Sequence, residues 1–338
     1  MKNFKIKKEF IKETFKSFND LNVLIIGDVM VDSYMWGKVN RISPEAPVPI
    51  VAIQSKEQRL GGAANVALNI QAMGANPILC SVIGVDYDGQ HFLDLLKKQK
   101  LSQKGILKSR NRITTNKTRI IGNNHQLVRV DEEVEEDITP NETDQLLQLI
   151  LFILQHDKID VIIFEDYNKG LITPKLIKSV VEMAKKRNIP IAVDPKKKNF
   201  SSYKGVTLFK PNLKELREGL KLDAENDNLK ELQKAVSSFR VKQKIHTALI
   251  TLSEKGIYTN SRFLKEIIPA HIRNIADVSG AGDTVISVAA LCLAMELHPI
   301  LTAALSNLAG GLVCEEVGVV PINKAKLLEE ALHLEFVK

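Results

Sequence analysis

The sequence has few of the features that mark secreted, membrane-spanning or metal-binding proteins. Only three of its 338 residues are cysteines, and Cys80, Cys292 and Cys314 lie far apart in apolar surroundings. Their spacing does not suit a metal site, so we expect buried thiols in a reducing compartment. No apolar run reaches the length of a membrane span, and the N-terminus lacks the pattern of a signal peptide. We therefore expect a cytoplasmic protein.

Aromatic residues are also scarce, at 5% of the chain, whereas hydrophobic residues as a whole make up 44%. This balance suits an α/β protein with buried aliphatic strands. The 47 Lys and Arg outnumber the 40 Asp and Glu, but they are scattered and lack interleaved aromatics, so we expect no nucleic-acid partner. The motif Gly-x-x-x-x-Gly-Lys-Ser/Thr is missing, which argues against a P-loop enzyme.

The N-terminal stretch is basic and amphipathic. Residues 2–18 place Phe4, Ile11, Phe15 and Phe18 at helical spacing among lysines. A helix of this kind either lies on a membrane surface or packs on its own domain. Acidic residues in the same stretch weaken the membrane alternative, so we expect packing and no membrane partner.

Strands and helices alternate along much of the chain. Strands are expected at 23–26, 161–164, 191–193 and 206–209, and such alternation predicts a parallel sheet with right-handed crossovers. In such sheets ligands bind at the carboxyl ends of the strands. Polar side chains follow these strand ends: Asp28, Asp166, Asp194, Asn212 and Glu215. They fit a hydrated Mg²⁺ held through carboxylate and substrate phosphates, and Asp28 and Asp32 are placed to bind sugar hydroxyls.

A small β-lid is expected outside the main sheet. Three prolines exclude a helix from the segment 34–51, and residues 48–53 have the pattern of an edge strand. A hairpin is predicted around Gly122-Asn123-Asn124, and it carries three cations, Lys117, Arg119 and Arg129. These cations either protect a sheet edge or clamp a negatively charged substrate, and the pattern leaves both open.

The stretch 277–284, Asp-Val-Ser-Gly-Ala-Gly-Asp-Thr, precedes a long apolar helical pattern. A helix that starts at Gly280, Ala281 and Gly282 would offer free N–H groups and a positive dipole end to a phosphoryl group. Asp283 would lie at the edge of this anion hole, where a carboxylate can take a proton from an attacking hydroxyl. The alternative is that Ser279 or Asp283 merely caps the helix.

Three further segments carry weaker signals. A second glycine-led helix start spans 60–70 and contains Asn65. A hairpin at 249–258 either lines a nucleotide or is only a turn. An apolar helix at 301–313 carries Asn307.

Taken together, three of these segments carry a family resemblance. Gly61-Gly62-Ala63-Ala64-Asn65, residues 212–215 (Asn-Leu-Lys-Glu) and residues 280–283 (Gly-Ala-Gly-Asp) resemble, in order and spacing, motifs of the ribokinase-like sugar kinases of the phosphofructokinase-B type. The resemblance extends from about residue 21 to about residue 321. It implies a three-layer α/β/α fold with a mostly parallel sheet and a β-strand lid within 33–54 and 113–131, in one domain over 1–338.

A narrower resemblance lies within it. The segments 27–32, 41–49, 117–119 and 126–129 are similar to those of D-glycero-β-D-manno-heptose 7-phosphate kinases. Those enzymes phosphorylate the anomeric hydroxyl to give the 1,7-bisphosphate, on the route to ADP-heptose for lipopolysaccharide. Many are fused to a nucleotidylyltransferase, whose His-x-Gly-His is missing here, so the chain resembles the stand-alone kinase. The alternatives are a kinase of the same fold for another sugar, sugar phosphate or nucleoside, and a catalytically silent anion- or sugar-binding protein.

The resemblance also implies roles for individual residues. It makes Asp283 the catalytic base and places ATP and Mg²⁺ near Glu215, with a monovalent cation as a further option. The nucleotide site would comprise Asn212, Leu213, Lys214, Glu215, Ser253, Glu254, Gly256 and Asn307. The sugar site would comprise Asp28, Asp32, Gly62 and Asn65, bordered by Asp166, Lys169, Asp194 and Lys196. The lid usually forms a homodimer interface in this family. Ser279 departs from the family's commoner threonine.

Overall fold

The computed structural model describes residues 4–222 and 229–338. Within them, nine strands form the central sheet in the order β13-β12-β11-β10-β9-β8-β1-β4-β5. In that order the strands are β13 (Lys265–Ile268), β12 (Ile257–Asn260), β11 (Thr247–Thr251), β10 (Leu208–Phe209), β9 (Ile191–Asp194), β8 (Val161–Glu165), β1 (Asn22–Gly27), β4 (Asn76–Gly84) and β5 (Ile106–Ser109). From β11 to β5 all neighbours pair in parallel, and only β12 and β13 are antiparallel. The mostly parallel sheet is therefore confirmed.

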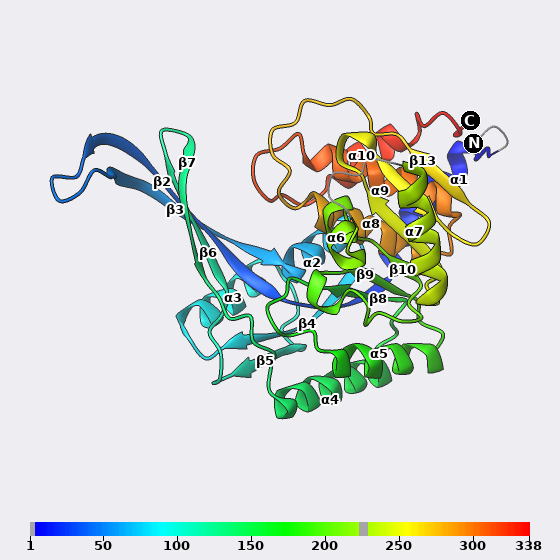
Figure 1. Ribbon diagram of the computed structural model, residues 1–338, viewed down its shortest axis with the longest axis horizontal. Coiled ribbons are helices and arrows are strands. Elements are labelled where there is room, and N and C mark those ends of the chain that lie inside the picture. Colours follow the sequence, from blue (N-terminus) through cyan, green and yellow to red (C-terminus); the bar gives the residue numbers. More distant parts are fainter. Residues whose placement is uncertain (1–3, 223–228) are drawn as a thin grey trace.

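Helices cover both faces of this sheet (Figure 1). One face carries α1 (Lys8–Ser17), α2 (Ala63–Ala72), α3 (Tyr87–Lys98), α8 (Ala281–Ala294), α9 (Pro299–Val313) and α10 (Lys324–Ala331). The other carries α4 (Pro140–His156), α5 (Pro174–Lys186), α6 (Leu213–Leu220) and α7 (Leu229–Lys242). Alternate residues of β1 supply the two cores, because successive strand side chains point to opposite faces. Val23 and Ile25 join the first core, and Leu24 and Ile26 the second.

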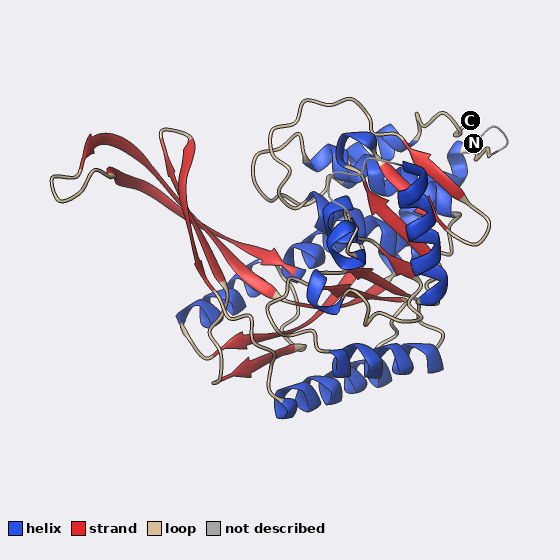
Figure 2. Cartoon of the chain, viewed as in Figure 1, coloured by secondary structure: helices blue, strands red, loops and turns tan. Residues whose placement is uncertain are grey.

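The lid is a separate four-stranded sheet of order β3-β2-β6-β7. Its strands are β2 (Val29–Ile42), β3 (Pro49–Gly62), β6 (Asn116–Gly122) and β7 (His125–Glu132). Figure 2 shows that these long strands project from the helical body without a helix on them. The predicted edge strand is confirmed as β3, which runs on to Gly62. The β6–β7 turn has positive φ at Asn123 (52°) and Asn124 (65°), as expected of a tight hairpin.

The N-terminal helix packs on its own domain. Ile11 and Phe15 of α1, and Phe18 just after it, are buried in the same core as α10. The packing alternative is thereby confirmed. Across the described residues, no helix combines the length and apolarity needed to cross a bilayer.

Candidate active site

The start of α8 lies beneath the carboxyl edge of the sheet and is shaped by a glycine. Gly280 occupies the N-cap position at φ 78°, and within the described residues no side chain caps the helix. A Cβ there would strain the left-handed backbone and would come within 3.1 Å of the Asn65 amide nitrogen. The alternative in which Ser279 or Asp283 serves as the cap is therefore wrong. The first N–H groups of α8 form the kind of terminus that binds anions.

Asp283, in the first turn of α8, is held by two hydrogen bonds. Tyr167 donates its hydroxyl to Oδ1 at 2.7 Å, and Asn65 donates its amide to Oδ2 at 2.6 Å. The side chain is almost fully buried, with 5% of the residue exposed. Burial raises the pKa of Asp283, while the two hydrogen bonds and the nearby lysines lower it. The carboxylate is thus fixed in orientation next to the anion-binding terminus.

A buried cluster of charges surrounds this carboxylate at the ends of β8, β9 and β10. Lys210 pairs with Asp194 at 2.7 Å, and both are buried. A Cβ on Gly282 would lie 3.6 Å from the Lys210 ammonium, which places this pair directly under the start of α8. Glu165 is the neighbour of Asp194 in the sheet register. Lys196 pairs with Glu215.

The electrostatics of this cluster are dominated by burial. Burial raises the pKa of Asp194 to about 6, against the opposing effect of the two lysines. Burial, Asp194 and Asp283 together raise the pKa of Glu165 well above its ordinary value. Although burial alone would lower the pKa of Lys196, the carboxylates of Asp194 and Glu215 raise it. In the described part of the chain, Oδ1 of Asp194 and Oε2 of Glu165 find no hydrogen-bond partner. These orphaned oxygens fit a site that takes a cation.

A cavity of about 780 Å³ opens beside the start of α8. It brings together most of the residues predicted for the nucleotide and the anion hole: Asn212, Glu215, Ser253, Glu254, Gly256, Gly280, Ala281, Gly282, Asp283 and Asn307. Asp194 and Lys196, predicted at the border of the sugar site, line it as well. Leu213 and Lys214 lie in the first turn of α6 but do not belong to the described lining. Residues as far apart in sequence as Asp194 and Asn307 thus line one cavity at the predicted edge of the sheet.

Local structure explains part of the nucleotide motifs. Asn212 and Glu215 form a capping box, in which each side chain accepts a hydrogen bond from the backbone N–H of the other. Gly256, at φ 90°, turns the β11–β12 connection so tightly that a Cβ would meet the Ile268 carbonyl at 2.0 Å. Asn307 donates to the Pro269 carbonyl at 2.8 Å. These residues line the cavity, and their hydrogen bonds and backbone turns also fix its shape.

Two aspartates predicted near the sugar are occupied with backbone and side-chain donors. Asp28 accepts from the N–H groups of Tyr167 (2.9 Å), Lys169 (3.2 Å) and Leu171 (3.1 Å). Asp166 accepts from the Asn168 N–H and from the side chains of Asn199 and Tyr203. Both carboxylates organise the loop that follows β8, and in this structure their bonds go to that loop. The contact of Asp28 with sugar hydroxyls and the place of Asp166 at the border of the sugar site stay predictions.

The cations of the lid are each paired with an acid. Arg119 pairs with Asp32 at 2.6 Å. Arg129 pairs with Asp131 at 2.9 Å and is half exposed on the edge strand β7. Lys117 pairs with Asp131 and Glu133. Edge protection and substrate clamping both stay possible for Arg129, whereas Arg119 lies on the inner strand β6.

A salt-bridge chain ties the lid to the loop after β8. Lys169 pairs with Glu133 at 2.7 Å and with Glu135 at 2.8 Å, and Glu133 also pairs with Lys117. Gly62 ends β3 and serves as the N-cap of α2, next to Asn65. Lid and core therefore meet where the predicted sugar residues lie.

Several residues of this site were missed from the sequence. Tyr167, Lys210 and Glu165 were not proposed, although each lies at or just after a predicted strand end, which was a usable signal. Arg59 and Tyr34 were missed as well, and no local motif marks them. The guanidiniums of Arg59 and Arg119 lie 5.0 and 5.2 Å from the centre of the Tyr34 ring, a cation–π arrangement on the lid.

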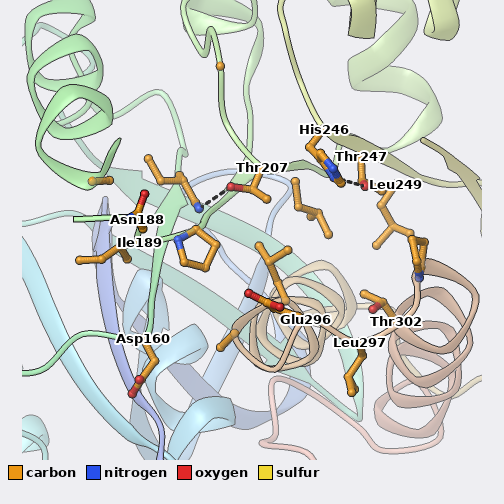
Figure 3. A pocket seen from close by; sticks show the side chains of 18 of the residues that line it. Asp160, Asn188, Ile189, Thr207, His246, Thr247, Leu249, Glu296, Leu297 and Thr302 are labelled. Carbon is orange, nitrogen blue, oxygen red and sulfur yellow. Dashed lines mark hydrogen bonds between the residues drawn. The ribbon is translucent and has the colours of Figure 1, made fainter. Parts of the chain in front are cut away.

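A second cavity, of about 910 Å³, opens at the opposite edge of the sheet (Figure 3). Asp160, Pro190, Thr207 and His246 line it just before β8, β9, β10 and β11 begin. Its polar groups serve the strand starts, as when the Thr207 hydroxyl accepts from the Ile191 N–H at 3.0 Å. Of the residues predicted for the site, none belongs to its described lining. The predicted residues that line a cavity line the one at the carboxyl edge.

The mostly parallel sheet, the glycine-started helix α8 and the buried carboxylate of Asp283 can now be set beside known proteins. A family model described as "pfkB family carbohydrate kinase" matches residues 20–326, and the chain belongs to this family. The chain is 40% identical to "Bifunctional protein HldE" of Campylobacter jejuni (strain RM1221) over 310 residues. That match covers 91% of this chain but 64% of the relative, so the chain spans less than two thirds of its length.

Solved structures give the same fold. Phosphofructokinase-2 from Escherichia coli in complex with potassium is similar with a TM-score of 0.75 and 17% identity, covering 92% of this chain and 99% of that one. Arabidopsis thaliana ribokinase complexed with ribose and ATP is similar with a TM-score of 0.68 and 15% identity, covering 91% of this chain and 99% of that one. The fold is therefore ribokinase-like, and the protein is a sugar kinase by family.

Proposed function

We propose that this kinase transfers the γ-phosphoryl group of ATP to the anomeric hydroxyl of D-glycero-β-D-manno-heptose 7-phosphate. The product is the 1,7-bisphosphate, a step toward ADP-heptose and lipopolysaccharide. The observation that carries the kinase chemistry is Asp283, buried and held by two hydrogen bonds beside the start of α8. The heptose assignment rests on the sequence segments of the lid and of β1–β2.

In the proposed reaction the chain supplies position and charge. The cavity beside α8 takes the nucleotide, and the N–H groups of the helix start stabilise charge on the transferring phosphoryl group. Asp283 accepts the proton of the sugar hydroxyl as that oxygen attacks phosphorus. Lys210 and Lys196 keep positive charge next to the base and the phosphates.

Magnesium fits the same edge of the sheet. Asp194, with its orphaned oxygen, and Glu215 are the residues that would hold the ion with its water shell. When bound with ATP, Mg²⁺ neutralises phosphate charge. Among the described residues, no group of three or more acidic, histidine or cysteine side chains would cage a metal alone, which suits an ion held largely by phosphate and water. A monovalent cation is a further proposal, suggested by the potassium complex of Escherichia coli phosphofructokinase-2.

The sugar would bind between lid and core. Asn65, which is bonded to Asp283, lies at its reacting end, and the lid cation Arg119 is paired with Asp32. If the phosphate of the sugar displaces the Asp32 carboxylate, Arg119 exchanges its ion pair with Asp32 for one with the substrate. This proposal gives the lid cations the clamping role.

The lid is also proposed to form a homodimer interface. Its strands and the β2–β3 connection expose apolar side chains to solvent: Ile42, Val48, Ile53, Leu127, Val128 and Val130. A second copy of the chain would cover them. We further propose that residues 1–338 form one kinase domain, and that its three free, buried cysteines belong to a reducing, cytoplasmic setting.

The test is ADP release with ATP and Mg²⁺, offering the heptose 7-phosphate beside ribose, fructose 6-phosphate and adenosine. Strong selectivity for the heptose phosphate supports the proposal. Activity on another acceptor alone replaces the substrate and keeps the kinase. Silence on all of them favours a binding protein of the same fold.

A further inference from the structure

We propose that Tyr167 is a positioning residue, whose hydroxyl holds the carboxylate of Asp283 in the orientation and charge state in which it accepts a proton. This inference rests on the proposed role of Asp283 as base. It does not depend on which sugar is the acceptor.

The geometry joins Tyr167 directly to the base. Its hydroxyl lies 2.7 Å from Oδ1 of Asp283, and the other carboxylate oxygen is taken by Asn65. One donor on each oxygen fixes the plane of the carboxylate. Tyr167 also lines the nucleotide cavity, and the Lys196 ammonium lies 5.5 Å from the centre of its ring. The residue therefore lies between the nucleotide space and the base.

The backbone of Tyr167 is held as firmly as its side chain. Its N–H donates to Asp28 at 2.9 Å, and Asp28 also binds the N–H groups of Lys169 and Leu171. Asp28 thus anchors the loop that carries Tyr167. Asp28, which follows β1, therefore helps to position Tyr167, in addition to the sugar contact predicted from the sequence.

Tyr167 acts as the donor in this pair. Burial raises the pKa of its phenol well above the ordinary value, and the charges of Asp283 and Glu165 raise it further. The phenol therefore keeps its proton and stabilises the ionised form of Asp283. Besides Tyr167, the titratable groups that face Asp283 are Glu165 on β8, Asp194 on β9, and Lys196 and Lys210 after β9 and β10. All four stay in place when only the hydroxyl is removed.

The test compares Tyr167→Phe with wild type in the pH dependence of kcat/KM, using the acceptor on which the wild type is most active. Losing a hydrogen bond to a charged group moves the acidic limb to higher pH by about one to two units. The plateau rate also falls, because one of the two orienting donors is gone. The KM for ATP changes little.

The chain offers a matched control. Tyr203 is also a buried phenol that donates to a carboxylate, Oδ2 of Asp166 at 2.9 Å, but it does not contact the base. Tyr203→Phe is expected to lower the melting temperature to a similar degree while leaving the acidic limb in place. A limb that shifts equally in both variants, or in neither, overturns the proposal.

A second readout works without turnover. The Asp283 carboxyl resonance can be identified in ¹³C NMR by its loss in Asp283→Asn, and then titrated in wild type and in Tyr167→Phe. We expect its midpoint to rise in the variant by the same one to two units, about the shift that such a hydrogen bond supports. An unchanged midpoint contradicts the proposal. A shifted midpoint in a protein that phosphorylates no sugar would uphold the Tyr167 contact and reject the kinase function.

Discussion

Replacing Asp283 by asparagine removes the proposed base and changes the rest of the site very little. The amide has nearly the same shape: its oxygen can still accept from the Tyr167 hydroxyl, and its NH2 group can donate to Asn65 once the Asn65 amide turns its oxygen toward it. It cannot accept the sugar proton. We expect kcat to fall by about 10²–10⁴-fold, the usual contribution of a general base. That range corresponds to roughly 3–5 kcal/mol in the activation free energy.

The same variant is expected to fold at least as well as wild type. Asp283 is 5% exposed, and burial raises its pKa. Burying the ionised carboxylate therefore lowers the stability of the folded state. A neutral amide avoids that cost. We therefore expect an unchanged or higher melting temperature and unchanged ATP binding by calorimetry.

The assay is coupled ADP release at saturating ATP, together with a single-turnover measurement that isolates the chemical step. A variant whose turnover is within about threefold of wild type would refute the role of Asp283, because so small a loss is far below the loss expected on removal of a base. A large loss of both activity and ATP binding would instead indicate damage to the cavity. Only loss of turnover with intact binding matches the account.

Three further predictions concern the lid, the buried loop and the assembly. Arg119→Ala and Arg129→Ala should each raise the KM for heptose phosphate far more than the KM for ATP, in steady-state kinetics; equal increases would point to general lid damage. Burial raises the pKa of Asp28 from 3.8 to about 6, so the folded state binds its proton more tightly than the unfolded state does. Between about pH 4 and 6 its contribution to stability must therefore fall as pH rises. In urea titrations, the free energy of unfolding of wild type, relative to that of Asp28→Asn, should fall by at most about 3 kcal/mol over this range. A relative free energy of unfolding that does not change with pH would mean that folding does not raise the pKa of Asp28. Val128→Glu should convert a dimer to monomer in light scattering, and an unchanged mass would exclude this face of the lid.

Much of the fold was predictable because its signals are local. Val23 to Ile26 form an uninterrupted aliphatic run, which is typical of a strand buried on both faces, and both faces are indeed covered. Thr173 caps α5 and Pro174 is its first residue, and a threonine directly before a proline is a local signal for a helix start. Gly280 likewise marks a helix start without a side-chain cap, within the described chain. In each case the information lies within a few residues.

The remainder depends on contacts between distant segments. Asp28 looks like a free carboxylate at a strand end, but the N–H groups that it binds come from a loop about 140 residues away. Arg119 resembles an unpaired cation, yet Asp32 on the neighbouring strand neutralises it. Tyr167 follows a predicted strand end, but only the folded chain brings its hydroxyl to Asp283. Long-range pairing of this kind leaves no local pattern.

The most direct test of the account is ³¹P NMR of the reaction of wild-type protein with ATP, Mg²⁺ and D-glycero-β-D-manno-heptose 7-phosphate. The account predicts a second sugar phosphate resonance, from a phosphate at the anomeric carbon, that grows in equal amount to ADP and is lost in Asp283→Asn. ADP formed together with inorganic phosphate alone, or no change in the heptose phosphate while another sugar is phosphorylated, would contradict it.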